Sequence, residues 1–200
     1  MREFNEVVFV VFNRCHVVRK LGSIALISMA AAALPVQAEV KDASPSGFTL
    51  ENSAVVPVDA MTAWQALVGS VDAWWPKDHT WWGRASKLSI DARAGGCFCE
   101  IAGDRQAQHM QVVFADPQKL LRMIGGLGPF QGMGLSGVLE WRMTPVDGGT
   151  RITLWYRAGG YTPEDVSKLA PLADGVQALQ LGGLAKYLRD RSAKPLKQPQ

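Results

Sequence analysis

The chain has 200 residues, of which 48% are hydrophobic and 20% are charged, a composition typical of a globular protein. Three cysteines are too few for a disulfide-stapled scaffold, and the apolar content is too high for a disordered chain. The 21 basic residues barely exceed the 18 acidic ones and form no basic block, which argues against a nucleic-acid-binding protein.

The first 38 residues have the pattern of a secretory signal peptide. Arg19 and Lys20 precede the uncharged run 21–34, and Ala38 ends an A-x-A-like cleavage site. The run is shorter than the roughly 20 apolar residues of a transmembrane helix, although an uncleaved anchor is the alternative. We expect cleavage after Ala38, a linker over 39–46, and a periplasmic or secreted protein without membrane contact after cleavage.

The middle of the chain is dominated by runs in which apolar and polar residues alternate, the pattern of strands with one buried face. In 135–144, for example, Leu139, Trp141 and Met143 share one face, and polar residues occupy the other. Apolar residues at helical spacing follow Asp59, which is a suitable N-cap. In chain order we expect a strand at 47–56, a helix at 58–71, a short strand at 88–90, and strands at 97–102, 107–115, 119–124, 135–144 and 150–157.

A long helix is expected over about 170–190, separated by Pro171 from a shorter one. Gly182 and Gly183 interrupt it, each at a cost of about 1 kcal/mol relative to alanine. This pattern indicates a close approach to the sheet, room for a ligand, or glycines without a packing role. The polar residues 192–200 form an expected flexible tail. The apolar stripe of the helix would consist of Leu172, Val176, Leu179, Leu184 and Leu188.

Alternating strands followed by a long helix predict an α+β fold with an antiparallel sheet covered on one face. The order of elements and the strings at 95–100 (GGCFCE), 125–129 (GGLGP) and 148–151 (GGTR) resemble the START-like, or SRPBCC, superfamily. The resemblance is to its bacterial branch related to polyketide cyclases and heat-shock ATPase activators. It implies a helix-grip domain over 47–191, in which a curved sheet wraps around the C-terminal helix and encloses a cavity for an apolar ligand. It supplies no catalytic motif, and we expect no cofactor and no metal.

Cys97 and Cys99 lie two positions apart in an expected strand. At that spacing the backbones are about 6.6 Å apart and the side chains are roughly parallel, whereas a disulfide needs Cβ atoms about 3.8 Å apart. A bridge would therefore require a bulge, and we expect two small, buried, reduced thiols. A strained redox pair and a metal site are the alternatives, although no third soft ligand lies nearby in the sequence.

Glu100 and His109 would face each other if 103–106 formed a four-residue turn, at a cross-strand Cβ distance of about 4.5–5.5 Å. A histidine oriented by a carboxylate is a candidate general base, so these two are the candidate catalytic residues. On the surface the same pair would be a weak salt bridge. We expect the surface position, although a one-residue slip would reverse it. The reason is that the opposite face carries a more apolar set, namely Cys97, Cys99, Ile101, Met110 and Val112.

The remaining candidates are aromatic residues that could border a cavity. Trp141 lies on the apolar face of its strand, and Trp75 belongs to the tryptophan-rich loop 74–83, which also contains His79. Core packing is the alternative for these tryptophans, and a solvated side chain is the alternative for the histidine. The glycine-rich run 125–134 lacks the Lys-Ser/Thr of a phosphate loop and is typical of a flap or a long connection. The candidate ligand-binding residues are Trp75, Cys97, Cys99, Met110 and Trp141.

Three functional hypotheses follow, and the third is a protein-interaction module, which a large exposed apolar patch outside the cavity would favour. The favoured one is a secreted or periplasmic protein that binds an apolar small molecule between the sheet and the C-terminal helix. The alternative is a cyclase-like or hydrolytic enzyme that uses Glu100 and His109. A pair that faces the cavity would favour the enzyme, and a pair that faces solvent would favour the binding protein.

Overall fold

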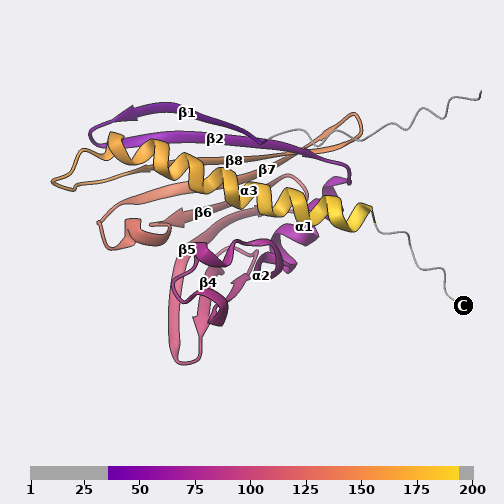
Figure 1. The fold of residues 1–200 in the computed structure, drawn as a ribbon, viewed down its shortest axis with the longest axis horizontal. Helices are drawn as coiled ribbons and strands as arrows, with labels where there is room; N and C mark the ends of the chain where they lie inside the picture. The colour runs from indigo at the N-terminus through magenta and orange to yellow at the C-terminus, as the bar shows by residue number, and fades with distance from the viewer. Residues whose placement is uncertain (1–35, 194–200) are drawn as a thin grey trace, which may run out of the picture. The chain divides into compact units, whose positions relative to one another are not determined.

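The computed structural model describes residues 36–193, so the expected signal peptide before Val36 and the tail beyond Ala193 lie outside the described residues. Within that range eight strands form a single antiparallel sheet with the order β1-β2-β8-β7-β6-β5-β4-β3 (Figure 1). The strands are β1 (Gln37–Ser44), β2 (Gly47–Val56), β3 (Lys87–Ile90), β4 (Cys97–Ala102), β5 (Arg105–Asp116), β6 (Leu120–Gly125), β7 (Ser136–Val146) and β8 (Gly149–Gly159).

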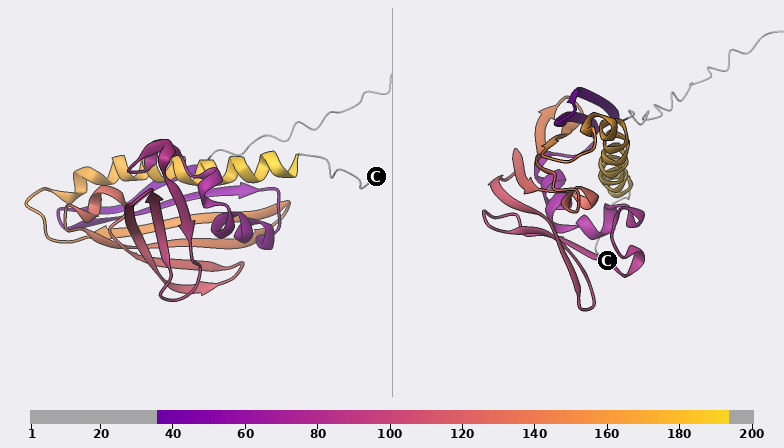
Figure 2. Two further views of the ribbon diagram at one scale, coloured as in Figure 1. Left: turned by 90° about the horizontal axis from the view of Figure 1, so that it is seen from below. Right: turned by 90° about the vertical axis from the view of Figure 1, so that its left-hand side faces the viewer.

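The helices all pack on one face of this sheet. The long helix α3 (Ala170–Ser192) crosses that face, and the sheet curves around it (Figure 2). The shorter α1 (Ala60–Gly69) and α2 (Val71–Trp74) follow β2. The fold is therefore α+β and helix-grip-like, as the sequence predicted. No helix in the described range is long and apolar enough to cross a membrane.

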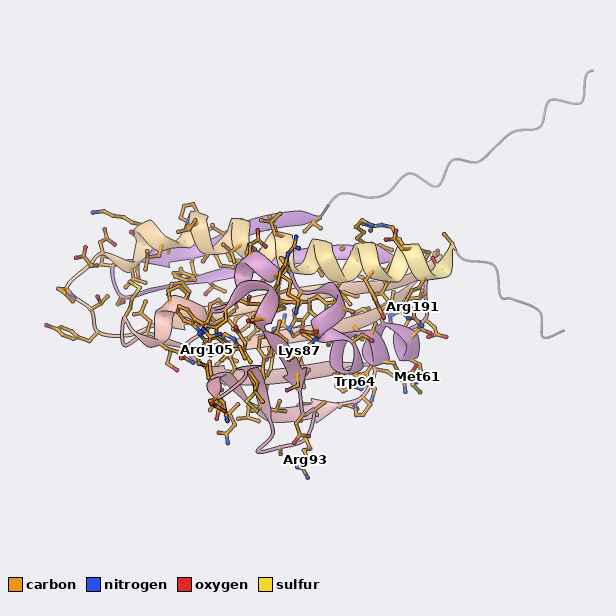
Figure 3. All side chains as sticks on the ribbon, turned by 60° about the horizontal axis from the view of Figure 1, so that its bottom comes forward. Met61, Trp64, Lys87, Arg93, Arg105 and Arg191 are labelled. Atoms are coloured by element: carbon orange, nitrogen blue, oxygen red, sulfur yellow. A yellow bond between two sulfur atoms is a disulfide. The ribbon has the colours of Figure 1, made fainter. Side chains whose placement is uncertain are left out.

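Local sequence explains where α1 begins and which side it buries. Asp59 caps the helix, because its Oδ1 accepts a hydrogen bond of 2.7 Å from the backbone N–H of Thr62. Trp64 and Leu67 are buried at helical spacing, whereas Met61 is exposed (Figure 3). The expected single helix over 58–71 is divided, since Ser70 separates α1 from α2.

The expected linker over 39–46 is instead most of an additional strand, β1, followed by a two-residue turn. This strand pairs with β2 from Gln37↔Ser53 to Ser44↔Gly47. Residues 38–44 are exposed, because an edge strand has a neighbour on one side only. Such a strand lacks apolar alternation, which is why its sequence resembles a linker.

The core lies between the concave face of the sheet and the helices. Trp141 of β7 is 1% exposed and packs edge-on against Trp74, with ring centroids 5.7 Å apart. The inward position expected for Trp141 is confirmed.

The expected apolar stripe of α3 is correct only in its second half. Leu184 and Leu188 are buried, but Leu172 and Leu179 are 70% and 61% exposed. Gln177 is buried instead. The first half of α3 therefore presents a mixed polar and apolar surface to the sheet.

Candidate functional site

A cavity of about 420 Å³ lies beside the first half of α3. Leu172, Val176 and Gln177 line it from the helix, and His109 lines it from β5. Two connections complete the wall: the segment 75–81, which precedes β3, and the segment 127–133, which joins β6 to β7. The lining is mostly aliphatic and aromatic, with a few polar groups, which is the usual character of a small-molecule site.

The polar centre of this wall is a buried contact between Glu100 of β4 and His109 of β5. Oε2 of Glu100 lies 2.8 Å from Nε2 of His109, and the two side chains are 0% and 6% exposed. Oε1 of Glu100 accepts hydrogen bonds from the backbone N–H groups of Trp81, at 2.9 Å, and Trp82, at 3.3 Å. The Ser86 hydroxyl donates to the same oxygen. These donors replace the water that the buried carboxylate has lost.

This arrangement assigns the protonation pattern of the His109 ring. Because the Glu100 carboxylate is the acceptor, Nε2–H is the donor, and the neutral ring then carries its lone pair on Nδ1. His109 Nδ1 is buried and has no hydrogen-bond partner in the structure. The cavity wall thus holds an imidazole that a carboxylate orients, and in the neutral ring Nδ1 is a buried acceptor without a protein partner.

The structure corrects the expected surface position of this pair. The 103–106 turn was expected to place Glu100 opposite His109, but Glu100 pairs with Ala107, while Phe98 pairs with Met110. His109 is the extra residue of a bulge between these pairs, and both it and Met110 are buried. The inner face of β4 carries Phe98 and Glu100, so the expected division of the two faces was wrong.

The structure also corrects the expectation of reduced thiols. Cys97 and Cys99 form a disulfide with Cα atoms 5.4 Å apart, closer than the roughly 6.6 Å of a regular strand. The extra residue of the bulge belongs to the facing strand β5, opposite the two cysteines, and not to β4, where such a bridge was argued to require it. Both alternate with the buried Phe98 and Glu100, lie on the outer face of β4, and do not line the cavity.

The other sequence-predicted residues divide between the cavity and the core. Trp75 lines the cavity, and its Nε1–H donates a hydrogen bond of 3.1 Å to the backbone carbonyl of His79, another lining residue. Met110 and Trp141 are buried in the core and do not line the cavity. A ligand-binding role for these residues stays a prediction.

Gln177 and Phe130 are among the lining residues that the sequence analysis missed. Gln177 is 2% exposed, and its only sequence signal is an amide between the expected stripe positions of α3. Phe130 lies in the 127–133 connection and stacks on the core residue Tyr156, with ring centroids 6.3 Å apart. Burial raises the pKa of Tyr156 to about 12, so the phenol stays neutral at physiological pH.

Three buried polar atoms that lack a protein partner belong to lining residues: His79 Nδ1, His109 Nδ1 and Gln177 Oε1. Buried polar atoms in folded proteins are nearly always hydrogen-bonded to protein, water or ligand. These three atoms come from three parts of the lining, namely the 75–81 segment, β5 and α3. No group of three or more His, Cys, Asp or Glu side chains that could hold a metal occurs between residues 36 and 193.

Comparisons with known proteins identify the fold. No protein-family model matches the chain, and no curated protein matches it. Among solved structures, CalU16 from Micromonospora echinospora is 12% identical, with a TM-score of 0.55 over 81% of this chain and 88% of that chain.

Two further structures agree. DynU16, described as a putative protein in the dynemicin biosynthetic locus, is 19% identical, with a TM-score of 0.52 over 74% of this chain and 48% of that chain. A protein of unknown function from Enterococcus faecalis is 13% identical, with a TM-score of 0.53 over 82% of both chains. At these identities the likeness shows the fold alone, an antiparallel sheet that curves around a long C-terminal helix.

Proposed function

We propose that this protein binds an apolar small molecule in the cavity between the sheet and α3. The observation that carries the proposal is the 420 Å³ cavity itself, whose wall combines Trp75, Phe130 and Val176 with a few polar groups. Transfer of apolar surface from water into such a cavity contributes about 25 cal/mol per Å², and the polar groups orient the ligand.

We propose further that the ligand carries a hydroxyl or N–H group. His109 Nδ1 is a buried acceptor without a protein partner, and a ligand donor would satisfy it. The lining carries no lysine or arginine, which disfavours an acidic ligand.

The test compares 2-naphthol with 2-methoxynaphthalene, which share a ring system but differ in the hydroxyl donor. We expect fluorescence titration to show saturable binding of both, with the naphthol preferred by about three- to tenfold, the value of one hydrogen bond. The preference should vanish in His109→Phe and persist in Trp155→Phe, because Trp155 does not line the cavity. Absence of saturable binding to the folded wild-type protein would contradict the proposal.

A second candidate is an enzyme of the cyclase-like or hydrolytic kind, and the buried Glu100–His109 pair favours it. A neutral histidine that is held by a carboxylate in the wall of a cavity can take a proton from a substrate hydroxyl or acidic C–H group at Nδ1. Glu100 would stabilise the imidazolium that forms. We also propose that the chain belongs to the bacterial branch related to polyketide cyclases and heat-shock ATPase activators, and the strings at 95–100, 125–129 and 148–151 support this.

The enzymatic candidate is tested by hydrogen–deuterium exchange at an activated methylene of a small aromatic ketone such as 2-tetralone. Wild-type protein should accelerate the exchange, and His109→Phe should abolish the acceleration while the protein stays folded. Equal exchange rates with the wild type and with His109→Phe would contradict the enzymatic candidate, and ligand binding would then be the proposed function. We also propose that the protein acts in the periplasm or outside the cell, in line with its N-terminal sequence.

A further inference from the structure

We propose that the Cys97–Cys99 disulfide positions His109, so that the oxidation state of this pair controls the proton-accepting group of the cavity. The consequence for ligands rests on the proposed function, but the effect on His109 does not.

The disulfide acts on the local shape of β4 and not on the global stability of the chain. The entropy gained from a cross-link grows with the length of the loop that it closes, and this one joins residues only two apart in sequence. What the bond changes is the span of the strand, since the Cα atoms lie 5.4 Å apart instead of about 6.6 Å.

The shortened span lies opposite the bulge that contains His109. Cys97 pairs with Gln111 and Cys99 pairs with Gln108, so two steps along β4 face three steps along β5. A shorter β4 segment increases this mismatch, and the β5 strand accommodates it by leaving His109 unpaired.

Regular pairing would give His109 a different position. Continued from Phe98↔Met110, a register without the bulge would set His109 opposite Cys99. Residues directly opposite each other in an antiparallel pair share a face, and Cys99 lies on the outer face. His109 would then point away from the cavity and from Glu100, whose side chain is on the inner face.

The contacts of the His109 ring come from the same short segment of β4. Phe98, between the two cysteines, packs against His109 with ring centroids 5.1 Å apart and against Trp75 at 5.0 Å. Glu100, which follows Cys99, supplies the hydrogen bond to Nε2. A change in the backbone of 97–99 therefore reaches both partners of the imidazole.

Residues of β6 and of the β6–β7 connection also contact the bulge, on the side of β5 away from β4. The side-chain amide of Gln131 donates to the backbone carbonyl of Gln108 and, at 3.4 Å, to that of His109. Gly125 allows the close approach, since a Cβ there would lie 3.2 Å from the His109 carbonyl oxygen. Because Gln131 belongs to the β6–β7 connection, the bulge links the disulfide to the segment that covers the cavity.

The redox step has a defined balance. A thiolate of a dithiol reductant attacks one cysteine sulfur, the S–S bond breaks, and the released thiolate takes up a proton. The second thiol of the reductant then displaces the remaining cysteine, which leaves two protein thiols and an oxidised reductant. Cys97 and Cys99 are partly exposed on the outer sheet face, where such a reductant can approach.

The experiment uses nitrogen NMR of the full chain labelled at its three histidines, without ligand. In the oxidised protein we expect one set of His109 signals, assigned by their loss in His109→Gln, with Nε2 protonated and Nδ1 unprotonated. Dithiothreitol should shift or split this set, and Cys97→Ser/Cys99→Ser should show the reduced pattern. Dithiothreitol should not affect the double variant, which controls for Cys15.

The outcomes separate this proposal from the proposed function. Unchanged His109 signals on reduction would overturn the positioning role, whatever 2-naphthol does. Loss of the native amide dispersion in the reduced protein would also overturn the positioning role, because the disulfide would then stabilise the whole fold and not the position of His109 alone. Changed His109 signals with about three- to tenfold weaker naphthol binding would support both proposals. Changed signals without naphthol binding to either form would support positioning and contradict the proposed function.

Discussion

At the scale of single residues, the Glu100–His109 contact shows how a charged group is kept in the interior of this protein. The two backbone donors and the hydroxyl donor on Oε1 leave only Oε2 for the histidine. Each donor compensates part of the desolvation that a buried carboxylate suffers. This arrangement also fixes the orientation of the imidazole. The unpartnered nitrogen of His109 is the atom to which the proposed ligand hydroxyl or N–H group and the proposed proton transfer are both assigned.

Among the core residues, Trp141 is the one whose truncation we expect to lower the stability of the protein most. It is 1% exposed and does not line the 420 Å³ cavity, so Trp141→Ala should lower the free energy of unfolding by about 3–5 kcal/mol. Urea titration measures the effect. Trp155→Ala is the matched control, because that ring lies on the outer face beside Arg142 and Arg157, and it should cost clearly less. Equal losses would contradict the packing described for Trp141.

Glu140 on the outer face of β7 predicts a dependence of stability on pH. Burial raises its pKa, but hydrogen bonds and charges from Arg122 and Arg142 outweigh burial and bring the pKa below the ordinary 4.5. The native state therefore favours the carboxylate, and the unfolded state takes up the proton first as the pH falls. The stabilisation is present above about pH 4.5 and is lost as the pH falls through the lower native pKa.

The measurement compares urea unfolding of wild type and Glu140→Gln between pH 7 and pH 3. Wild type should be the more stable at pH 7, and the difference in unfolding free energy should shrink as the pH falls. A difference that is independent of pH would show that Arg122 and Arg142 do not stabilise the ionised carboxylate.

At the scale of elements, α3 is positioned by a close approach at a glycine. A Cβ on Gly183 would lie 2.3 Å from the backbone carbonyl oxygen of Trp74, at the end of α2, a distance that real structures do not allow. A Cβ on Gly175, in the same helix, would meet nothing within 4 Å. Of the interpretations offered for the interrupted helix, close approach therefore applies to Gly183, although its partner is α2 and not the sheet.

Gly183→Ala should consequently destabilise the protein by about 1–3 kcal/mol, because the helices must move apart. Gly175→Ala should stabilise it by up to about 1 kcal/mol, since alanine is the better helix former and the site is open. Thermal unfolding of the two variants and the wild type measures both effects. Stabilisation by Gly183→Ala would contradict the contact between α3 and α2.

At the scale of the whole molecule, the expected cleavage site of the signal peptide lies within the strand β1. Cleavage after Ala38 would remove Gln37 and Ala38 from the strand but retain residues 39–44, whose pairing runs from Glu39↔Glu51 to Ser44↔Gly47. The processed chain would thus keep the edge strand that closes this side of the sheet.

We predict that the exported protein begins at Glu39. Intact-mass analysis should give the mass of residues 39–200 with the Cys97–Cys99 bond formed, that is, two hydrogens lighter than the reduced chain. Expression without export should give the uncleaved chain as the control. An exported protein that retains residues 21–38 would contradict the cleavage site.

The sequence by itself determined the fold class and most of the elements of this protein. The alternation in 135–144 placed Trp141 inward, because side chains on a strand point to opposite faces in turn. Asp59 and the apolar spacing after it located α1. These are local properties, and a few neighbouring residues are enough to specify them.

Only the tertiary structure decided which strands meet and in what register. The side-chain contact of Glu100 with His109 was predicted from the sequence, but in a register that the structure does not have. The burial of the two residues depends on a one-residue bulge, and a shift of one residue exchanges the two faces of a strand. The pairing of 37–44 with β2, and the burial of Gln177 in place of Leu172, likewise depend on residues distant in sequence. Local periodicity establishes that one face is buried, whereas contacts between separate segments select the face and assemble the cavity.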